Sequence, residues 1–222
     1  AMQPQVKIPT IVGLVLLILL VGTVITVTER VLPSRARAGA NQQPVNIQIT
    51  NVSDTAFTVS WVTTTPATGT LSVSSKQGTQ AIFDEQDTGG ALGTYTSHSV
   101  TMRNAKPSND FAATILSNGK KYVDGGKPYA IRTPATLSPN PSLLEPAYGT
   151  IVTAENRPAA GALVYLTLEG GQMLSTLSKP SGTWLIPLNL VRTADLSSFL
   201  PTTDRMTETI VVRFSGQESQ AT

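Results

Sequence analysis

The side chains that could carry out acid–base or metal chemistry are few, and they lie close together in the sequence. The chain has one histidine, His98, and no cysteine. Three carboxylates, Asp84, Glu85 and Asp87, precede it. Catalysis needs several such groups to converge on a substrate, whereas His98 lies between two serines in a predicted strand whose side chains alternate between faces. We therefore expect a histidine at the surface or rim of its module rather than a catalytic base.

Metal and phosphate sites are not predicted either. Zinc requires several histidine, cysteine or carboxylate ligands, which one histidine cannot supply. The three carboxylates lack the alternating oxygen ligands of a good calcium loop, so an acidic, solvated loop is favoured over a loose calcium site. Gly89-Gly90 and Gly125-Gly126 predict turns, because neither pair leads from a strand into a phosphate-binding helix. The sequence thus predicts no enzyme, no catalytic residue, no metal and no cofactor. One sequon, Asn51-Val-Ser53, is a candidate glycosylation site.

The composition favours β-strands and turns. The 222-residue chain has a net charge of +2, and only 14% of its residues are charged. The basic residues are scattered, so we predict no nucleic-acid partner. Hydrophobic residues make up 40% of the chain and alternate with polar ones, which argues against disorder. Beyond a hydrophobic N-terminus, the length leaves room for two β modules of about 90 residues each.

An uncharged apolar run, Ile8–Thr28, predicts a hydrophobic helix within residues 1–32. About 20 apolar residues are enough to cross a bilayer. Gly13 and Gly22 would let such helices approach one another closely. Residues 33–43 read as a linker, because Pro33 stops the helix. The side chains predicted to meet lipid or other helices are Ile8, Ile11, Leu14, Leu17, Ile18, Val21, Val24 and Ile25.

A cleavable signal peptide is the alternative for this segment. Ala38-Gly39-Ala40 has the small-x-small form of a cleavage site. The apolar run is longer than the usual signal core of about 7–15 residues, so we expect a retained helix. Charge does not orient it as expected, because Lys7 precedes the run and Arg30, Arg35 and Arg37 follow it. The placement of the modules outside the cytoplasm rests on the family resemblances below.

Residues 44–134 predict the first β-sandwich. Apolar and polar residues alternate in Val45–Thr50, and Trp61 follows in a second strand and is expected in the core. Further strands are predicted at Gly69–Val73, Ser97–Met102, Phe111–Leu116 and Tyr129–Arg132, with a glycine-rich contact loop at 77–93.

This module resembles fibronectin type III domains. Pro44–Trp61 is similar to the opening two strands of that family, and Thr96–Pro107 to a later strand that enters a proline-containing corner. The resemblance implies a seven-stranded sandwich used for spacing and contact, without catalytic residues. The family usually has leucine before the corner proline and tyrosine after it, where this chain has Ala105 and Phe111. Phe111 keeps the ring for core packing but lacks the hydroxyl, so we expect a weaker corner.

A linker at 135–145 leads to a second predicted sandwich at 146–222. Ala162–Leu168 is mostly apolar, which favours a well-buried strand. Leu174–Ser178 and Thr183–Leu188 predict a hairpin, and Arg192–Leu200 predicts a helical turn. Gly149-Thr-Ile-Val, Arg157–Leu166 and Lys179–Trp184 resemble the carboxypeptidase regulatory-like family, a transthyretin-like sandwich, with Trp184 expected in the core. The resemblance implies a non-catalytic module.

The predicted fold is therefore mainly β, with a hydrophobic N-terminal α-helix and two Ig-like or transthyretin-like sandwiches. Two functions fit this plan. The first is a structural subunit of an extracellular, pilus-like filament, with helices in the core and β heads outside. The second is a single-pass, membrane-anchored adhesion or spacer protein at the cell surface. The expected partners are copies of the chain through the helix and membrane lipid before or instead of assembly, with surface ligands or glycans as further candidates.

Overall fold

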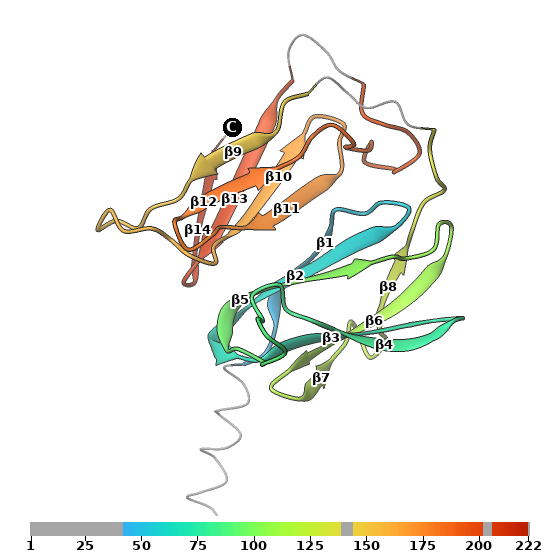
Figure 1. Ribbon diagram of the computed structural model, residues 1–222, viewed down its shortest axis with the longest axis horizontal. Helices are drawn as coiled ribbons and strands as arrows, with labels where there is room; N and C mark the ends of the chain where they lie inside the picture. Colours follow the sequence, from blue (N-terminus) through green and yellow to red (C-terminus); the bar gives the residue numbers. More distant parts are fainter. Residues whose placement is uncertain (1–41, 139–143, 202–205, 222) are drawn as a thin grey trace, which may run out of the picture. The chain divides into compact units, whose positions relative to one another are not determined.

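The computed structural model describes residues 42–138, 144–201 and 206–221 (Figure 1). In these ranges the chain forms strands β1 to β14 and no helix, which confirms the mainly β prediction. They belong to one compact unit, Gln42–Thr222. The predicted helix at 1–32, with its eight contact residues from Ile8 to Ile25, lies outside the described residues. No helix in the described part of the chain is long and apolar enough to cross a membrane.

The first sandwich consists of two antiparallel sheets with the orders β1-β2-β5 and β4-β3-β6-β7. Strands β7 and β8 pair with different halves of β6, so they share one of its edges. The strand bounds are β1 Val45–Thr50, β2 Ala56–Ala67, β3 Gly69–Ser75, β4 Gly78–Phe83, β5 Tyr95–Arg103, β6 Asp110–Ser117, β7 Lys120–Tyr122 and β8 Tyr129–Arg132. The predicted surface loop at 77–93 thus contains a strand, β4, that pairs with β3.

Side chains of β2 at every second position fill the first core. Phe57, Val59 and Trp61 are fully buried. The Phe57 ring lies 5.4 Å from the ring of Phe111, which β6 contributes from the opposite sheet. Fully burying one such side chain contributes roughly 1.5–3 kcal/mol. The period-two pattern of β2 therefore fixes which face of the strand meets the opposite sheet.

The corner after β5 is tied by Thr133 instead of a tyrosine hydroxyl. The Thr133 hydroxyl donates to the Lys106 carbonyl at 2.6 Å and accepts from the Asn109 N–H at 3.1 Å. Thr133 is fully buried, so these bonds are shielded from water. A residue distant in sequence therefore supplies a hydroxyl to the corner in which Phe111 has none.

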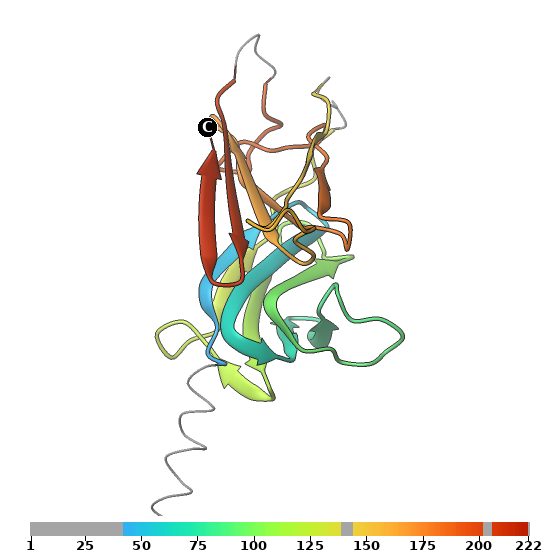
Figure 2. The same cartoon turned by 90° about the vertical axis from the view of Figure 1, so that its left-hand side faces the viewer.

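The second sandwich has a four-stranded sheet, β11-β10-β13-β14, and a two-stranded sheet, β12-β9. Figure 2 shows β13 and β14 as a hairpin at the red end of the colour bar. Trp184 lies in the core and contacts Gly149, where an added Cβ would come within 2.9 Å of the indole nitrogen. The strand bounds are β9 Ala147–Thr150, β10 Leu163–Leu168, β11 Met173–Leu177, β12 Thr183–Ile186, β13 Glu208–Phe214 and β14 Gln217–Ala221.

Two local predictions for this module are wrong. Strands β11 and β12 do not form a hairpin, because β12 pairs with β9 in the other sheet. This places Trp184 and Ile186 opposite the apolar face of β10, which a β11–β12 hairpin would leave uncovered. The stretch Arg192–Leu200 forms no helical turn. An Arg192–Phe199 bridge and a backbone bond from Leu200 N–H to the Val191 carbonyl close it as a loop that buries Leu200.

Candidate functional site

His98 is buried, and the prediction of a surface histidine is wrong. Its side chain has no exposed surface, and Nδ1 lies 2.9 Å from Oδ2 of Asp84, which is equally buried. The imidazole stacks on Trp61 with 4.9 Å between ring centroids and 15° between planes. In β5, His98 shares its face with Val100 and Met102, whose side chains enter the core. The alternation that exposes one face of a strand therefore turns this histidine inward.

The acidic stretch is only partly the solvated loop that the sequence predicts, because Glu85 is exposed whereas Asp84 is buried. Oδ1 of Asp84 accepts a bond from the Gln86 N–H at 3.0 Å, and Glu85 forms an ion pair with Arg103 at 2.8 Å. Asp87 accepts from the Gly93 N–H at 2.8 Å. The carboxylates thus hold the segment after β4 against β5, and each has its own partner.

Glycine at position 69 makes room for the histidine. A Cβ on Gly69 would lie 2.3 Å from Nδ1 of His98 and 3.0 Å from the Trp61 ring. Such distances are far below van der Waals contact, so any other residue would displace the His98–Asp84 pair. Gly69 begins β3, on the opposite sheet, and the pair is therefore enclosed from both sheets.

The two rings of this cluster are closed to solvent. Nε2 of His98 and Nε1 of Trp61 are buried and have no hydrogen-bond partner in the described part of the chain. A substrate would need access to such atoms, and both rings are fully buried. Across residues 42–138, 144–201 and 206–221, no group of three His, Cys, Asp or Glu side chains could hold a metal.

The interface between the two sandwiches is the more extensive polar site. Thr58 and Ser60 lie on the face of β2 opposite to the core residues, yet they are buried. The Ser60 hydroxyl bonds the Tyr165 hydroxyl of β10 at 2.9 Å, and the Thr50 hydroxyl bonds the Ser175 hydroxyl of β11. The outer face of the β1-β2-β5 sheet therefore packs against the outer face of the β11-β10 sheet. Burial raises the pKa of the Tyr165 hydroxyl above its ordinary value, so this group stays protonated and able to donate.

Two side-chain amides clamp this interface in opposite directions. The Asn51 side chain donates to the Ser175 carbonyl and accepts from the Ser175 N–H, both at 2.9 Å. The Gln172 side chain accepts from the Val52 N–H at 2.9 Å and donates to the Val52 carbonyl at 3.0 Å. Each amide thus pairs with the backbone of the other sandwich, as a strand neighbour would. Because the Asn51 amide is occupied, the sequon at 51–53 does not present a free acceptor in the folded protein.

A buried arginine extends the contact to the linker between the sandwiches. Arg192 donates to the Ala135 carbonyl at 3.1 Å and lies 3.4 Å from Asp54 of the first sandwich. Only 4% of its side chain is exposed. A buried guanidinium needs partners on several sides, and these come from both sandwiches and the linker. The two sandwiches therefore form one compact body and are not two independent domains.

Removing either amide clamp should loosen this body. In Asn51→Ala or Gln172→Ala, two backbone groups of the other sandwich lose their partners, so we expect each variant to lower the free energy of unfolding by about 1–3 kcal/mol. In the double variant, urea unfolding should separate into two transitions. Gln220→Ala, an exposed amide on β14, is the matched control and should change little. A single, unshifted transition in the double variant would show that the clamps do not couple the sandwiches.

The sequence-predicted core residues lie where core packing requires. Trp61 and Phe111 are in the first core and Trp184 is in the second. Sequence reasoning missed the burial of His98 and Asp84, and it missed the interface hydroxyls. One available signal was that His98, Val100 and Met102 fall at every second position, so that they share one face of their strand. A second was the continuous apolar run at 162–168, which predicts burial on both faces of β10.

Comparison with solved structures finds fibronectin type III domains among the similar chains. No family model and no curated protein matches it. The chicken CNTN1 FN1–FN3 domains are 13% identical over 81% of this chain and 64% of that chain, with a TM-score of 0.32. A two-domain fibronectin type III segment of chicken tenascin is 12% identical over 79% of this chain and 94% of that chain, with a TM-score of 0.29. At these TM-scores the β-sandwich fold stands on its own strand order and cores.

Proposed function

We propose that this protein is a structural, non-enzymatic subunit of an extracellular, pilus-like filament. In this proposal the helix of residues 1–32 packs with its copies in the filament core, and the β body forms the outside. The second sandwich acts as a carboxypeptidase regulatory-like spacer. The apolar run Ile8–Thr28 carries the proposal, because it has no charge and its side chains must be buried in lipid or against other helices.

The β body supports this role through its rigidity. Its two sandwiches share buried hydroxyl and amide bonds, so a filament would display one defined shape per subunit. The first described residue of the β body is also bound to it, since the Ser117 hydroxyl donates to the Gln42 carbonyl at 2.7 Å. The buried histidine pair is closed to substrates, which fits a structural protein better than an enzyme.

A membrane-anchored adhesion or spacer protein is the second candidate. The length of the same apolar run favours it, because about 20 residues suffice to span a bilayer. In this case the protein would stay monomeric in the membrane and present its β body at the cell surface to ligands or glycans.

Electron microscopy of the native protein separates the two candidates. We expect fibres from the full chain and a soluble, non-fibrous protein after deletion of residues 1–40. A native protein that stays a monomer in detergent would replace the filament by the anchored protein. Fibres that persist after the deletion would show that the N-terminal segment is not the core.

A further inference from the structure

The second sandwich is open along one side. Strand β9 has β12 as its one neighbour among the described strands, and β14 likewise has only β13. Two unpaired strand edges therefore flank the same side of the core. A two-stranded sheet cannot cover a four-stranded one, and β14 is exposed along its whole length. Unpaired edges of this kind are templates for an added strand.

A seam runs between these two edges. Its floor is the inner row of β13, Ile210, Val212 and Phe214, which are only partly buried. The register places Ser219 of β14 beside Val212 and Ala221 beside Ile210, so this row continues onto small residues of β14. Two cavities lie along the seam, of about 680 Å³ beside the end of β9 and about 490 Å³ beside its start.

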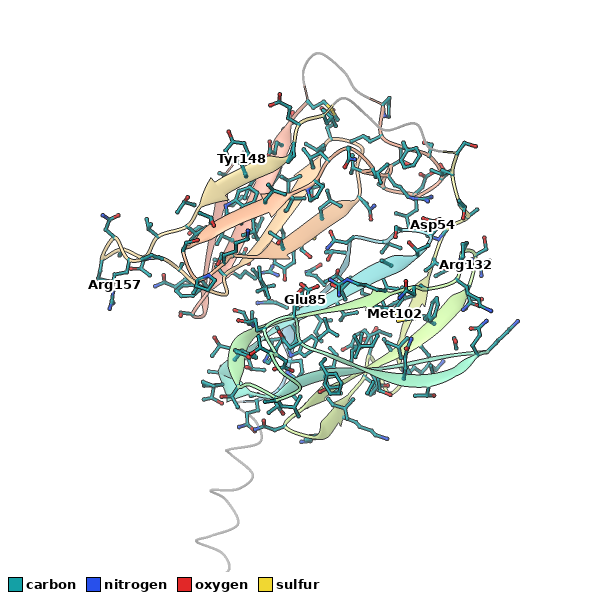
Figure 3. The ribbon with its side chains drawn as sticks, in the orientation of Figure 1. Asp54, Glu85, Met102, Arg132, Tyr148 and Arg157 are labelled. Carbon is teal, nitrogen blue, oxygen red and sulfur yellow. The ribbon has the colours of Figure 1, made fainter. Side chains whose placement is uncertain are left out.

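The side chains at the rim favour a peptide with two different faces. Tyr148 of β9 is 76% exposed and projects away from the strand (Figure 3). Glu208 lines the cavity at the start of β9, and Glu218 lies on the outer face of β14, paired with Arg213. Glu208 shares the inner face of β13 with Ile210 and Val212, because these residues fall at every second position. An added strand would thus meet small and apolar residues along most of its inner face, Glu208 at one end of that face, and Glu218 on its outer face.

One segment of this chain outside the described residues has that pattern. From Ser34 to Ala40 the sequence reads Ser-Arg-Ala-Arg-Ala-Gly-Ala, in which alanine occupies every second position. In an extended strand Ala36, Ala38 and Ala40 would share one face, and Arg35 and Arg37 the other. Small side chains can enter between two strands, and the arginines would lie on the same face as Glu218, whose charge is opposite.

The chain's own segment cannot fill its own seam. Gln42 is held by Ser117 of β6, in the sheet of the first sandwich that lies farthest from the second. Stacked sheets lie about 10 Å apart, so the seam, beyond two further sheets, is at least about 20 Å from Ser117. Ala40 lies two residues before Gln42 and reaches at most about 7 Å from it. The occupant must therefore come from another copy.

We propose that the seam binds residues Ser34–Ala40 of a second copy as an added β-strand. The contact joins two different surfaces, linker to seam, so it is head-to-tail and repeats without closing. This inference rests on the proposed filament and names the contact that would link successive subunits. It also assigns a role to the arginines after the apolar run, which membrane orientation alone does not explain.

Cysteine cross-linking of the full chain tests this contact, because the native chain has no cysteine. Ser219→Cys is combined in one chain with Ala36→Cys, Ala38→Cys or Ala40→Cys, which together cover the possible registers. Paired strands bring Cα atoms within disulfide distance on a shared face only. We expect at least one alanine position to give a ladder of disulfide-linked multimers on a non-reducing gel. Arg35→Cys and Arg37→Cys, on the opposite face, are the matched controls and should give several-fold less.

The outcomes separate this inference from the proposed function. Fibres without a ladder, or equal ladders from the alanine and arginine positions, would overturn the linker–seam contact and leave the filament standing. The seam would then belong to an extended peptide from another protein. A cross-linked monomer that migrates faster than the reduced chain would show an intrachain contact and also overturn it. A detergent monomer with neither fibres nor ladder would overturn the filament as well.

Discussion

Replacing His98 by alanine is expected to lower the free energy of unfolding of the β body by about 3–5 kcal/mol, because it removes a fully buried ring and leaves the buried Asp84 side chain without this hydrogen-bond partner. The Asp84 carboxylate would lose its 2.9 Å contact while remaining buried. The Trp61 ring would also lose its stacking partner, whose ring centroid lies 4.9 Å from its own. Since a domain is stable by only about 5–15 kcal/mol, this single change should remove a large part of the total.

The exposed ion pair between Arg132 and Asp110 provides the matched control. Its atoms lie 2.7 Å apart, but the side chains are 63% and 73% exposed. Water screens such a pair, so Asp110→Ala should cost less than about 1 kcal/mol. Urea unfolding of both variants, followed by tryptophan fluorescence, measures the difference. If His98→Ala unfolds at the same urea concentration as Asp110→Ala, the buried pair does not stabilise the fold.

Strands of the first sandwich could be predicted because their signals are local. Val45–Thr50 and Tyr129–Arg132 are strands with the bounds that the alternation of apolar and polar residues predicts. Trp61 follows the same logic, since it continues the buried row of Phe57 and Val59. The predicted boundaries of the linkers and modules stay predictions. The resemblance of the second module to the carboxypeptidase regulatory-like family also stays a prediction.

The interface could not be predicted because its chemistry looks like a solvent-facing surface. Thr58 and Ser60 alternate with apolar residues, and a period-two pattern is the same whether its polar face meets water or another polar sheet. The amide clamps join Asn51 to Ser175 and Gln172 to Val52, more than 100 positions away in sequence. No local pattern specifies such pairs. Only the apolar run around Tyr165 indicated that β10 is buried on both faces.

The buried pair was missed for a related reason. A surface segment separates Asp84 from His98 in the sequence. Their contact forms because β4, which Asp84 follows, and β5, which contains His98, lie in the two opposite sheets of the first sandwich. Polar residues near glycine-rich sequence usually form loops, so the sequence predicts a solvent-exposed carboxylate. The alternation along β5 indicates the burial of His98, because His98 shares a face with the buried Val100. A polar residue on the apolar face of a strand therefore predicts a buried hydrogen-bond partner elsewhere in the chain.

The second large effect concerns assembly, and Leu17→Lys should abolish it. Leu17 is near the middle of the uncharged run Ile8–Thr28. A lysine at the centre of an apolar helix environment costs about 2.5–3.5 kcal/mol per chain, and in a filament core every subunit would add this cost next to its neighbours' lysines. We therefore expect no fibres by electron microscopy.

The β body should be unaffected by this change, because residues 42–222 form their own compact unit. Its urea midpoint should match the wild type, which separates a failure of assembly from a failure of folding. Leu17→Met, which conserves volume and polarity, is the control and should still form fibres. Fibres from Leu17→Lys would mean that position 17 does not lie in an apolar core, and the filament would then need a different helix face or another contact to hold it together.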